Sequence, residues 1–195
     1  MKIKRLDEVF GVYSRWTKNR LALPATEDFK KESIAIRKDL VEYVLRCLES
    51  KQFCTVVGPL GFGKTWLCYA MAYELMGEKY LGRFVTVDES WDADSMLGQI
   101  KKWQVTEPFY WIIEDCQNAL SEICLFITRV QQREYPNHKF IFTVQGPRKY
   151  MSHYKFCNLE TEESCTVQLA KPGKKSIEHI IKIIKLFVEA VENYV

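Results

Sequence analysis

One eight-residue stretch holds residue types that bind phosphate. It reads Gly58-Pro59-Leu60-Gly61-Phe62-Gly63-Lys64-Thr65 and meets the pattern G-x-x-x-x-G-K-[ST] in full. Glycines let a backbone turn without Cβ clashes, and the N–H groups of such a loop can surround an anion. Lys64 would reach the β- and γ-phosphates of a nucleotide, and the Thr65 hydroxyl would bind Mg²⁺. We therefore expect the whole loop to contact nucleotide, with Trp66, the next residue, close to it.

A pair of acids ends the strongest strand-like run of the chain. Trp111-Ile112-Ile113 leads directly into Glu114 and Asp115. Hydrolysis of a nucleoside triphosphate uses one carboxylate to order Mg²⁺ and another to polarise the attacking water. We predict that both acids are catalytic, with Glu114 as the metal ligand beside Thr65 and Asp115 on the base side. A shift of one residue would exchange these roles, and Asp88-Glu89 is the weaker alternative for the metal.

Polar residues also close a later apolar run. Thr143 and Gln145 stand at the end of Phe140-Ile141-Phe142-Thr143-Val144. A polar group there could touch the γ-phosphate or the attacking water, which makes Gln145 a candidate nucleotide ligand. An ordinary polar strand end is the alternative interpretation.

The elements that must position these residues alternate along the chain. We expect strands at 53–57, 83–87, 109–113, 139–144 and 165–169, and helices at 40–48, 64–76, 92–103, 120–130 and 176–191. Asp92 or Asp94 would cap the third of these helices. Such alternation predicts an α/β fold, a three-layer αβα sandwich around a parallel five-stranded sheet. Ligands of such sheets bind beyond the carboxyl ends of the strands, where the glycine loop lies.

Composition limits the classes of function. Apolar residues make up 47% of the 195 residues and the net charge is +3, with basic and acidic residues interleaved, so direct nucleic-acid binding is not expected. The seven cysteines are odd in number and lack a C-x-x-C spacing, which argues against a disulfide framework or a zinc site. Without a membrane-length apolar run or a signal peptide, we expect a cytoplasmic protein. Residues 1–32 are expected to form a helical N-terminal extension, and 33–195 the nucleotide-binding domain.

The order of these motifs resembles the STAND class of signal-transducing, AAA-related ATPases, which includes the NACHT, NB-ARC and MalT-like regulators. The resemblance rests on Ile34-Ala35-Ile36-Arg37, on the glycine loop, on Ile112-Ile113-Glu114-Asp115-Cys116 and on the strand ending at Gln145. It implies the P-loop NTPase fold of the ASCE type, ATP/ADP and Mg²⁺ as cofactors, and Arg37 as a further nucleotide ligand. It also implies a conformational switch with slow hydrolysis, followed by a lid, a winged helix and an effector region.

Two positions depart from the class, and other functions stay open. The sensor strand of the class often ends Thr-Ser-Arg where this chain has Thr143-Val144-Gln145, and the acidic pair is inverted. A ring-forming AAA+ remodelling ATPase would need an arginine finger, for which the sequence offers Arg129, Arg133 and Arg148. A small kinase or a binding module without catalysis are further alternatives. The apolar stripe over 177–191 predicts a protein partner or self-association through the C-terminal region.

Overall fold

A six-stranded sheet organises the part of the chain that the structure describes. The computed structural model describes residues 2–9, 38–103, 105–132, 135–146 and 164–169. The strand order is β1-β3-β4-β5-β2-β6. The strands are β1 (Lys2–Arg5), β2 (Phe53–Gly58), β3 (Leu81–Thr86), β4 (Phe109–Glu114), β5 (His138–Gln145) and β6 (Ser164–Gln168). The helices are η1 (Asp7–Val9), α2 (Lys38–Ser50), α3 (Lys64–Gly77), α4 (Ala93–Lys102), η2 (Cys116–Ala119) and α5 (Leu120–Gln131).

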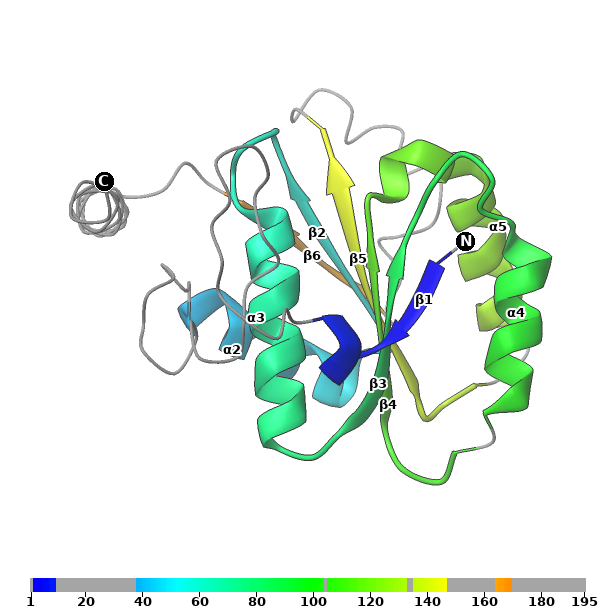
Figure 1. Cartoon of the computed structure of the whole chain (residues 1–195), viewed down its shortest axis with the longest axis horizontal. Helices are drawn as coiled ribbons and strands as arrows, with labels where there is room; N and C mark the ends of the chain where they lie inside the picture. The colour runs from blue at the N-terminus through cyan, green and yellow to red at the C-terminus, as the bar shows by residue number, and fades with distance from the viewer. Residues whose placement is uncertain (1, 10–37, 104, 133–134, 147–163, 170–195) are drawn as a thin grey trace, which may run out of the picture.

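Helices cover both faces of the sheet, which confirms the predicted three-layer sandwich (Figure 1). Helices α2 and α3 pack on one face and α4 and α5 on the other. The α4/α5 face is filled with aromatic rings, such as Phe53 and Phe140, whose ring centroids lie 5.5 Å apart. On the other face, α2 buries Val41, Val44 and Leu48 at helical spacing. Burial on both faces explains why the central strands are mostly apolar on both of their sides.

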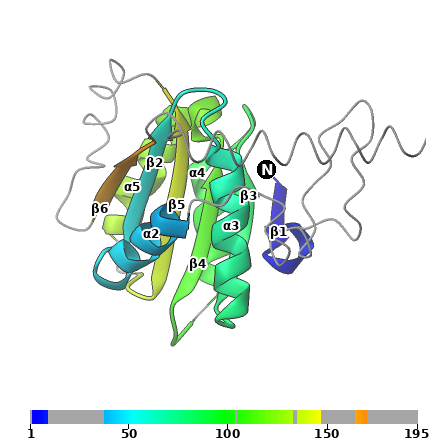
Figure 2. The same ribbon diagram turned by 90° about the vertical axis from the view of Figure 1, so that its left-hand side faces the viewer.

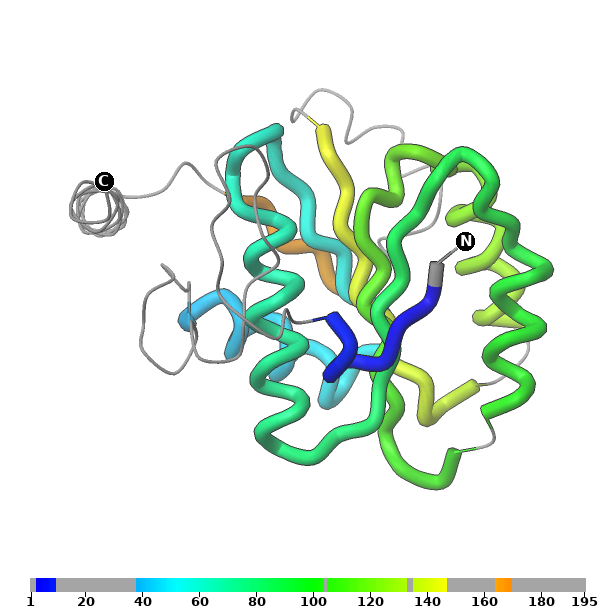
Figure 3. Tube along the Cα trace, viewed as in Figure 1, coloured from blue at the N-terminus to red at the C-terminus, as the bar shows by residue number. Residues whose placement is uncertain are grey.

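The sheet contains one strand more than the five predicted. All five predicted strands are present and pair in parallel. The additional strand, β1, is antiparallel to β3, with Ile3 opposite Val85, and lies at the sheet edge beside β3 (Figure 3). Its sequence, Lys2-Ile3-Lys4-Arg5, has a single apolar residue and is typical of a basic surface segment, so the strand was not predicted. That residue, Ile3, packs against the core.

The ends of helices α4 and α3 can be compared with the predicted ones. Asp92, rather than Asp94, caps α4, because its side chain accepts a hydrogen bond from the Ser95 N–H at 2.7 Å. Helix α3 ends at Gly77, one residue beyond the predicted end at 76, and Lys79 after it adopts the left-handed conformation.

His138 begins β5, one residue before the predicted start of this strand at 139. The ring accepts from the Trp111 indole N–H at 2.9 Å, and its other nitrogen lies 3.1 Å from the Trp103 carbonyl. These contacts fit a neutral ring that donates to Trp103, and burial lowers the pKa of His138.

Several expectations fall outside the described residues. These are Arg37, Arg133, Arg148, most of the expected helical extension over 1–32 with its boundary, and the expected helix over 176–191. Cys124 is disulfide-bonded, which the cysteine count did not lead us to expect. Within the described ranges, no helix has both the length and the apolar character that crossing a membrane requires.

Candidate phosphate-binding and catalytic site

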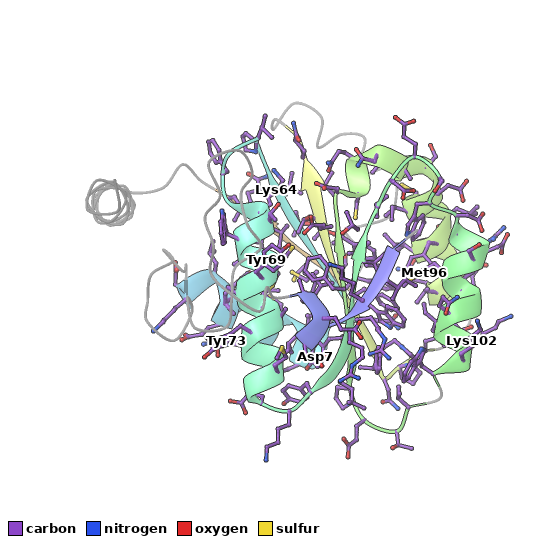
Figure 4. All side chains as sticks on the ribbon, viewed as in Figure 1. Asp7, Lys64, Tyr69, Tyr73, Met96 and Lys102 are labelled. Carbon is purple, nitrogen blue, oxygen red and sulfur yellow. The ribbon has the colours of Figure 1, made fainter. Side chains whose placement is uncertain are left out.

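The carboxyl ends of β2, β5 and β4 bring the predicted site residues to one edge of the sheet. Strand β5 lies between the other two, and Gly58 on β2 pairs with Gln145 on β5. A hydrogen bond of 3.3 Å from Gly146 N–H to the Gly58 carbonyl continues this pairing. Glu114 ends β4 at the same edge, and Figure 4 shows Lys64 at the adjacent end of α3. Residues far apart in sequence thus converge where a parallel sheet binds ligands.

The glycine loop has the backbone geometry of an anion-binding loop. Gly61 (φ 78°) and Gly63 (φ 84°) both adopt the left-handed conformation, which favours glycine. Gly63 caps the N-terminus of α3, and no side-chain hydrogen bond caps this end in the described part of the chain. The first backbone N–H groups of a helix lack partners within it, and the helix dipole adds positive potential there. The start of α3 is therefore suited to a phosphate group.

Gly58 is required by close packing rather than by its backbone angles. A Cβ atom at this position would lie 2.9 Å from Cβ of Leu169, the residue after β6. The Leu169 N–H also donates to the Val57 carbonyl at 2.8 Å. The start of the loop is consequently held between β5 and the end of β6.

The Lys64 ammonium lies under the loop and is largely buried. It donates to the carbonyls of Gly58 at 2.8 Å and Pro59 at 2.9 Å. An ammonium has three N–H donors, so one remains for a phosphate oxygen. Burial lowers the pKa of Lys64, and the nearby Asp115 carboxylate acts in the opposite direction. Lys64 is thus a preorganised cation at the loop.

Thr65 and Trp66 occupy the first turn of α3. Thr65 is exposed, beside the loop. The Trp66 ring lies 6.3 Å from the Tyr69 ring, so it packs along α3. Leu60 is the most exposed large apolar side chain of the loop, at 77%, and Phe62 is half-buried.

Glu114 is a buried carboxyl with an unused oxygen. Its side chain is 8% exposed, and Oε2 has no hydrogen-bond partner among the described residues. Burial, together with the Asp115 charge, raises the pKa of Glu114 to about 7, while Lys4 on β1 partly offsets this. An unpartnered buried carboxylate oxygen is costly unless a cation binds it. This feature fits a metal ligand.

Asp115 lies just beyond β4 in a strained backbone conformation. Its φ is 61°, which is uncommon for a residue other than glycine and tends to occur at functional sites. The Asp115 N–H donates to the Thr143 hydroxyl at 3.4 Å, and its Oδ1 accepts from the Gln117 amide at 3.1 Å. The Asp115 charge also acts on the Lys64 ammonium, where it offsets part of the lowering of the pKa by burial. Asp115 therefore faces the phosphate loop.

Gln117 is a site residue that the sequence did not reveal. Its amide nitrogen donates to Asp115, and its amide oxygen accepts from the Gln145 backbone N–H at 2.9 Å. One side chain thereby joins the ends of β4 and β5. No motif marks this residue, because the bridge depends on how the two strand ends align.

The remaining candidates are placed as follows. Thr143 is 2% exposed and holds the Asp115 backbone, so it serves as a positioning residue. Gln145 is exposed beside Gly58. Asp88 and Glu89 are exposed, and Asp88 accepts hydrogen bonds from the Ser90 N–H and hydroxyl at 3.0 and 2.6 Å. This turn contact explains Asp88 without a metal.

The residues present fit magnesium bound together with a nucleotide. No group of three or more His, Cys, Asp or Glu side chains suited to a metal occurs within the described ranges. Mg²⁺ commonly needs only one or two protein oxygens because phosphates and water complete its shell. The Thr65 hydroxyl and the unpartnered Glu114 oxygen supply that kind of ligand.

Comparison with known proteins agrees with this geometry. The family model nSTAND3, described as "Novel STAND NTPase 3", matches residues 36–182. No curated protein matches the chain significantly.

Three solved structures share the fold. PCH-2 of C. elegans has a TM-score of 0.54 at 16% identity, covering 78% of this chain and 46% of that one. Closed-state Hsp104 with ATPγS and FITC-casein has a TM-score of 0.57 at 13% identity, covering 80% and 32%. The extended S. cerevisiae Hsp104–casein complex has a TM-score of 0.60 at 13% identity, covering 86% and 33%. The chain thus matches a third to a half of the length of these structures.

Proposed function

Because this chain belongs to the nSTAND3 family of STAND NTPases, we propose that its P-loop module binds ATP and Mg²⁺ as a conformational switch with slow hydrolysis. One observation carries the proposal. The glycine loop and the start of α3, which no described side chain caps, lie at the same end of the sheet as the Glu114 carboxyl oxygen that has no partner among the described residues. The first feature suits the phosphates and the second suits the metal that accompanies them.

Each residue of the site has a separate role in this proposal. The loop N–H groups and Lys64 hold the β- and γ-phosphates, and Thr65 with Glu114 holds Mg²⁺. The ion would neutralise phosphate charge. Asp115 orients the attacking water and accepts its proton. Gln117 and Thr143 fix the carboxylate and backbone of Asp115, so they act through it.

The same contacts suggest how the γ-phosphate could be sensed. Gln145 is next to Gly58, and its backbone is joined through Gln117 to Asp115. A contact between Gln145 and the γ-phosphate would therefore shift the ends of both β4 and β5. ATP and ADP would then favour different arrangements of this edge, which is what a nucleotide switch requires.

A second candidate is a remodelling ATPase of the AAA+ type that works as an oligomer. The chain shares its fold with Hsp104, whose two matching structures were solved with ATPγS and casein or with casein, and this fold is compatible with such a function. Of the arginines that could serve as a finger, Arg129 forms an ion pair with Asp94 between α5 and α4. This pairing makes Arg129 the weaker choice. For either function we propose a cytoplasmic location and a protein partner or self-association through the C-terminal region.

Nucleotide binding by Lys64→Ala tests the proposal. Hydrogen bonds to charged groups contribute about 1.5–3 kcal/mol, so the variant should bind ATP·Mg²⁺ at least ~10-fold more weakly by calorimetry. Lys101→Ala, which removes an exposed lysine of α4, is the matched control and should bind like the parent. A Lys64→Ala variant with the affinity of the parent would show that this loop does not hold the phosphates.

A further inference from the structure

Three cysteine side chains meet at the sheet edge formed by β2 and β6. Cys54 on β2 and Cys165 on β6 are direct partners in the parallel pairing. Cys47 lies on α2, which packs against β2 (Figure 2). The Cys165 thiol is within hydrogen-bonding reach of both Cys54 and Cys47. All three are free cysteines; Cys54 is buried, whereas Cys47 and Cys165 are partly exposed.

The surroundings favour the thiolate form at Cys165. Hydrogen bonds from Cys54 and Cys47, with the charge of Lys51, outweigh burial and lower the pKa of Cys165 to about 7. The pKa of Cys54 is raised by its bond to Cys165, and that of Cys47 by burial. Tyr43 on α2 is the other titratable group facing Cys47, to which it is hydrogen-bonded. One nucleophile thus stands beside two neutral thiols.

We propose that Cys165 is an oxidisable nucleophile, which a peroxide converts to a sulfenic acid and which Cys47 then captures as a disulfide joining β6 to α2. In the first step the thiolate attacks one peroxide oxygen, an S–O bond forms, the O–O bond breaks, and hydroxide leaves and is protonated. In the second step the Cys47 sulfur attacks Cys165, an S–S bond forms, and the S–O bond breaks to release water. Two thiols and one hydrogen peroxide yield one disulfide and two waters.

Cys47 is a better resolving partner than Cys54. Cys54 is 0% exposed and lies inside the pairing of β2 with β6, so a peroxide-oxidised Cys165 would have to be captured within the packed sheet. Cys47 belongs to the last turn of α2, outside that pairing, and it is partly exposed.

The site also has a structural connection to the phosphate loop. Strand β6 leads from Cys165 to Leu169, whose Cβ contacts the start of the loop at Gly58. A bond between Cys165 and Cys47 would fix β6 to α2 just before this contact. The chemistry itself does not depend on nucleotide binding, so its failure would leave the proposed function untouched.

The test treats the full chain with hydrogen peroxide, blocks the remaining thiols and maps the peptides by mass spectrometry. We expect a Cys47–Cys165 disulfide. In Cys47→Ser, Cys165 should accumulate as a sulfenic acid that dimedone traps, and Cys165→Ser should give neither product. Cys68→Ala, which removes a fully buried thiol, should leave the disulfide unchanged. Apart from the disulfide that already holds Cys124, a new disulfide that leaves out Cys165, or a Cys47→Ser chain in which dimedone does not label Cys165, would overturn the assignment.

Two measurements on the unaltered chain avoid any effect of substitution on folding. The thiolate is the reactive form, so the rate of Cys165 oxidation should rise as the pH increases through about 7 and then level off. Cys165 should also react several-fold faster at pH 7 in the native chain than in the urea-unfolded chain. Equal rates in the two states would mean that the fold does not activate this thiol.

Discussion

The charged form of Glu114 suits a metal ion but destabilises the fold, because the side chain is buried. A carboxylate that binds a cation must be charged, but this side chain is 8% exposed and one of its oxygens has no partner among the described residues. The folded chain therefore holds the Glu114 proton up to a pKa of about 7, against an ordinary value of 4.5. Binding of the proposed metal ion would have to displace that proton. Functional sites often carry such a cost in stability.

Glu114→Gln should remove a pH dependence of stability. The unfolded chain loses this proton near pH 4.5 and the folded chain near 7, so the stabilisation present at low pH is lost as the pH rises through this range. A shift of this size corresponds to roughly 3 kcal/mol. Between pH 5 and pH 8, the unfolding free energy of Glu114→Gln should rise by about that amount relative to the parent. Urea titrations at the two pH values measure it, with the exposed Glu107→Gln as control. If the unfolding free energies of Glu114→Gln and the parent differ by the same amount at pH 5 and at pH 8, Glu114 has an ordinary pKa.

Separate substitutions of Glu114 and Asp115 should distinguish the roles of the two acids. Glu114→Gln should weaken Mg²⁺-dependent ATP binding because it removes the oxygen that suits the metal. Asp115→Asn should preserve binding and lower single-turnover hydrolysis by about 10²-fold or more, the usual size of a lost general base. Calorimetry and rapid-quench assays provide the two readouts. The reverse pattern would assign the metal to Asp115 and the base to Glu114.

Site residues that belong to a sequence motif could be predicted. Residues whose side chains bridge two motifs in space could not. The loop from Gly58 to Thr65 and the acids after β4 could be found because their types and spacing follow from the chemistry of phosphate binding. Gln117 could not, since its two contacts depend on the positions of Asp115 and Gln145 in different strands. Thr143 was found as a candidate contact, but its hydroxyl is used to hold the Asp115 backbone.

At the scale of elements, periodicity identified every long element within the described ranges and missed the short strand β1. The strands flanking the site are continuous apolar runs bounded by polar residues, which is a strong signal. Strand β1 has four residues with Ile3 as its single apolar side chain, so an alternation cannot be recognised. Pairing with β3, rather than local propensity, makes this segment a strand.

Two glycine substitutions should have opposite effects because their surroundings differ. In Gly58→Ala the new Cβ would lie 2.9 Å from Leu169 Cβ, so β2 and β6 must separate. We expect a loss of about 1–3 kcal/mol in unfolding free energy, as for other overpacked sites. At Gly98, inside α4, an added Cβ would meet no described atom within 4 Å, and Gly98→Ala should stabilise by about 0.5–1 kcal/mol. Denaturant unfolding measures both, and equal effects would refute the close contact at Gly58.

At the scale of the whole molecule, fold and mode of action have to be separated. The order of the parallel strands places β5 between β2, which leads into the glycine loop, and β4, which ends in the two acids. The same fold occurs in Hsp104 and PCH-2, of which this chain matches a third to a half. Fold likeness at 13–16% identity does not carry mode of action from one protein to another. Turnover and its dependence on assembly have to be measured.

Steady-state hydrolysis measured over a range of protein concentrations decides between a switch and an oligomeric machine. Glu114 would have to lose a proton held to about pH 7 before it could bind a cation, which opposes fast chemistry within one copy of the chain. Arg129, which a neighbouring copy could offer as a finger, is paired with Asp94, which opposes completion of the site by another copy. We therefore expect turnover well below the enzyme median of ~10 per second. The rate per chain should stay constant as concentration increases, and ADP should remain bound. If the rate per chain instead rises steeply with concentration and reaches that median, a neighbouring copy completes the site, and the AAA+ alternative replaces the switch.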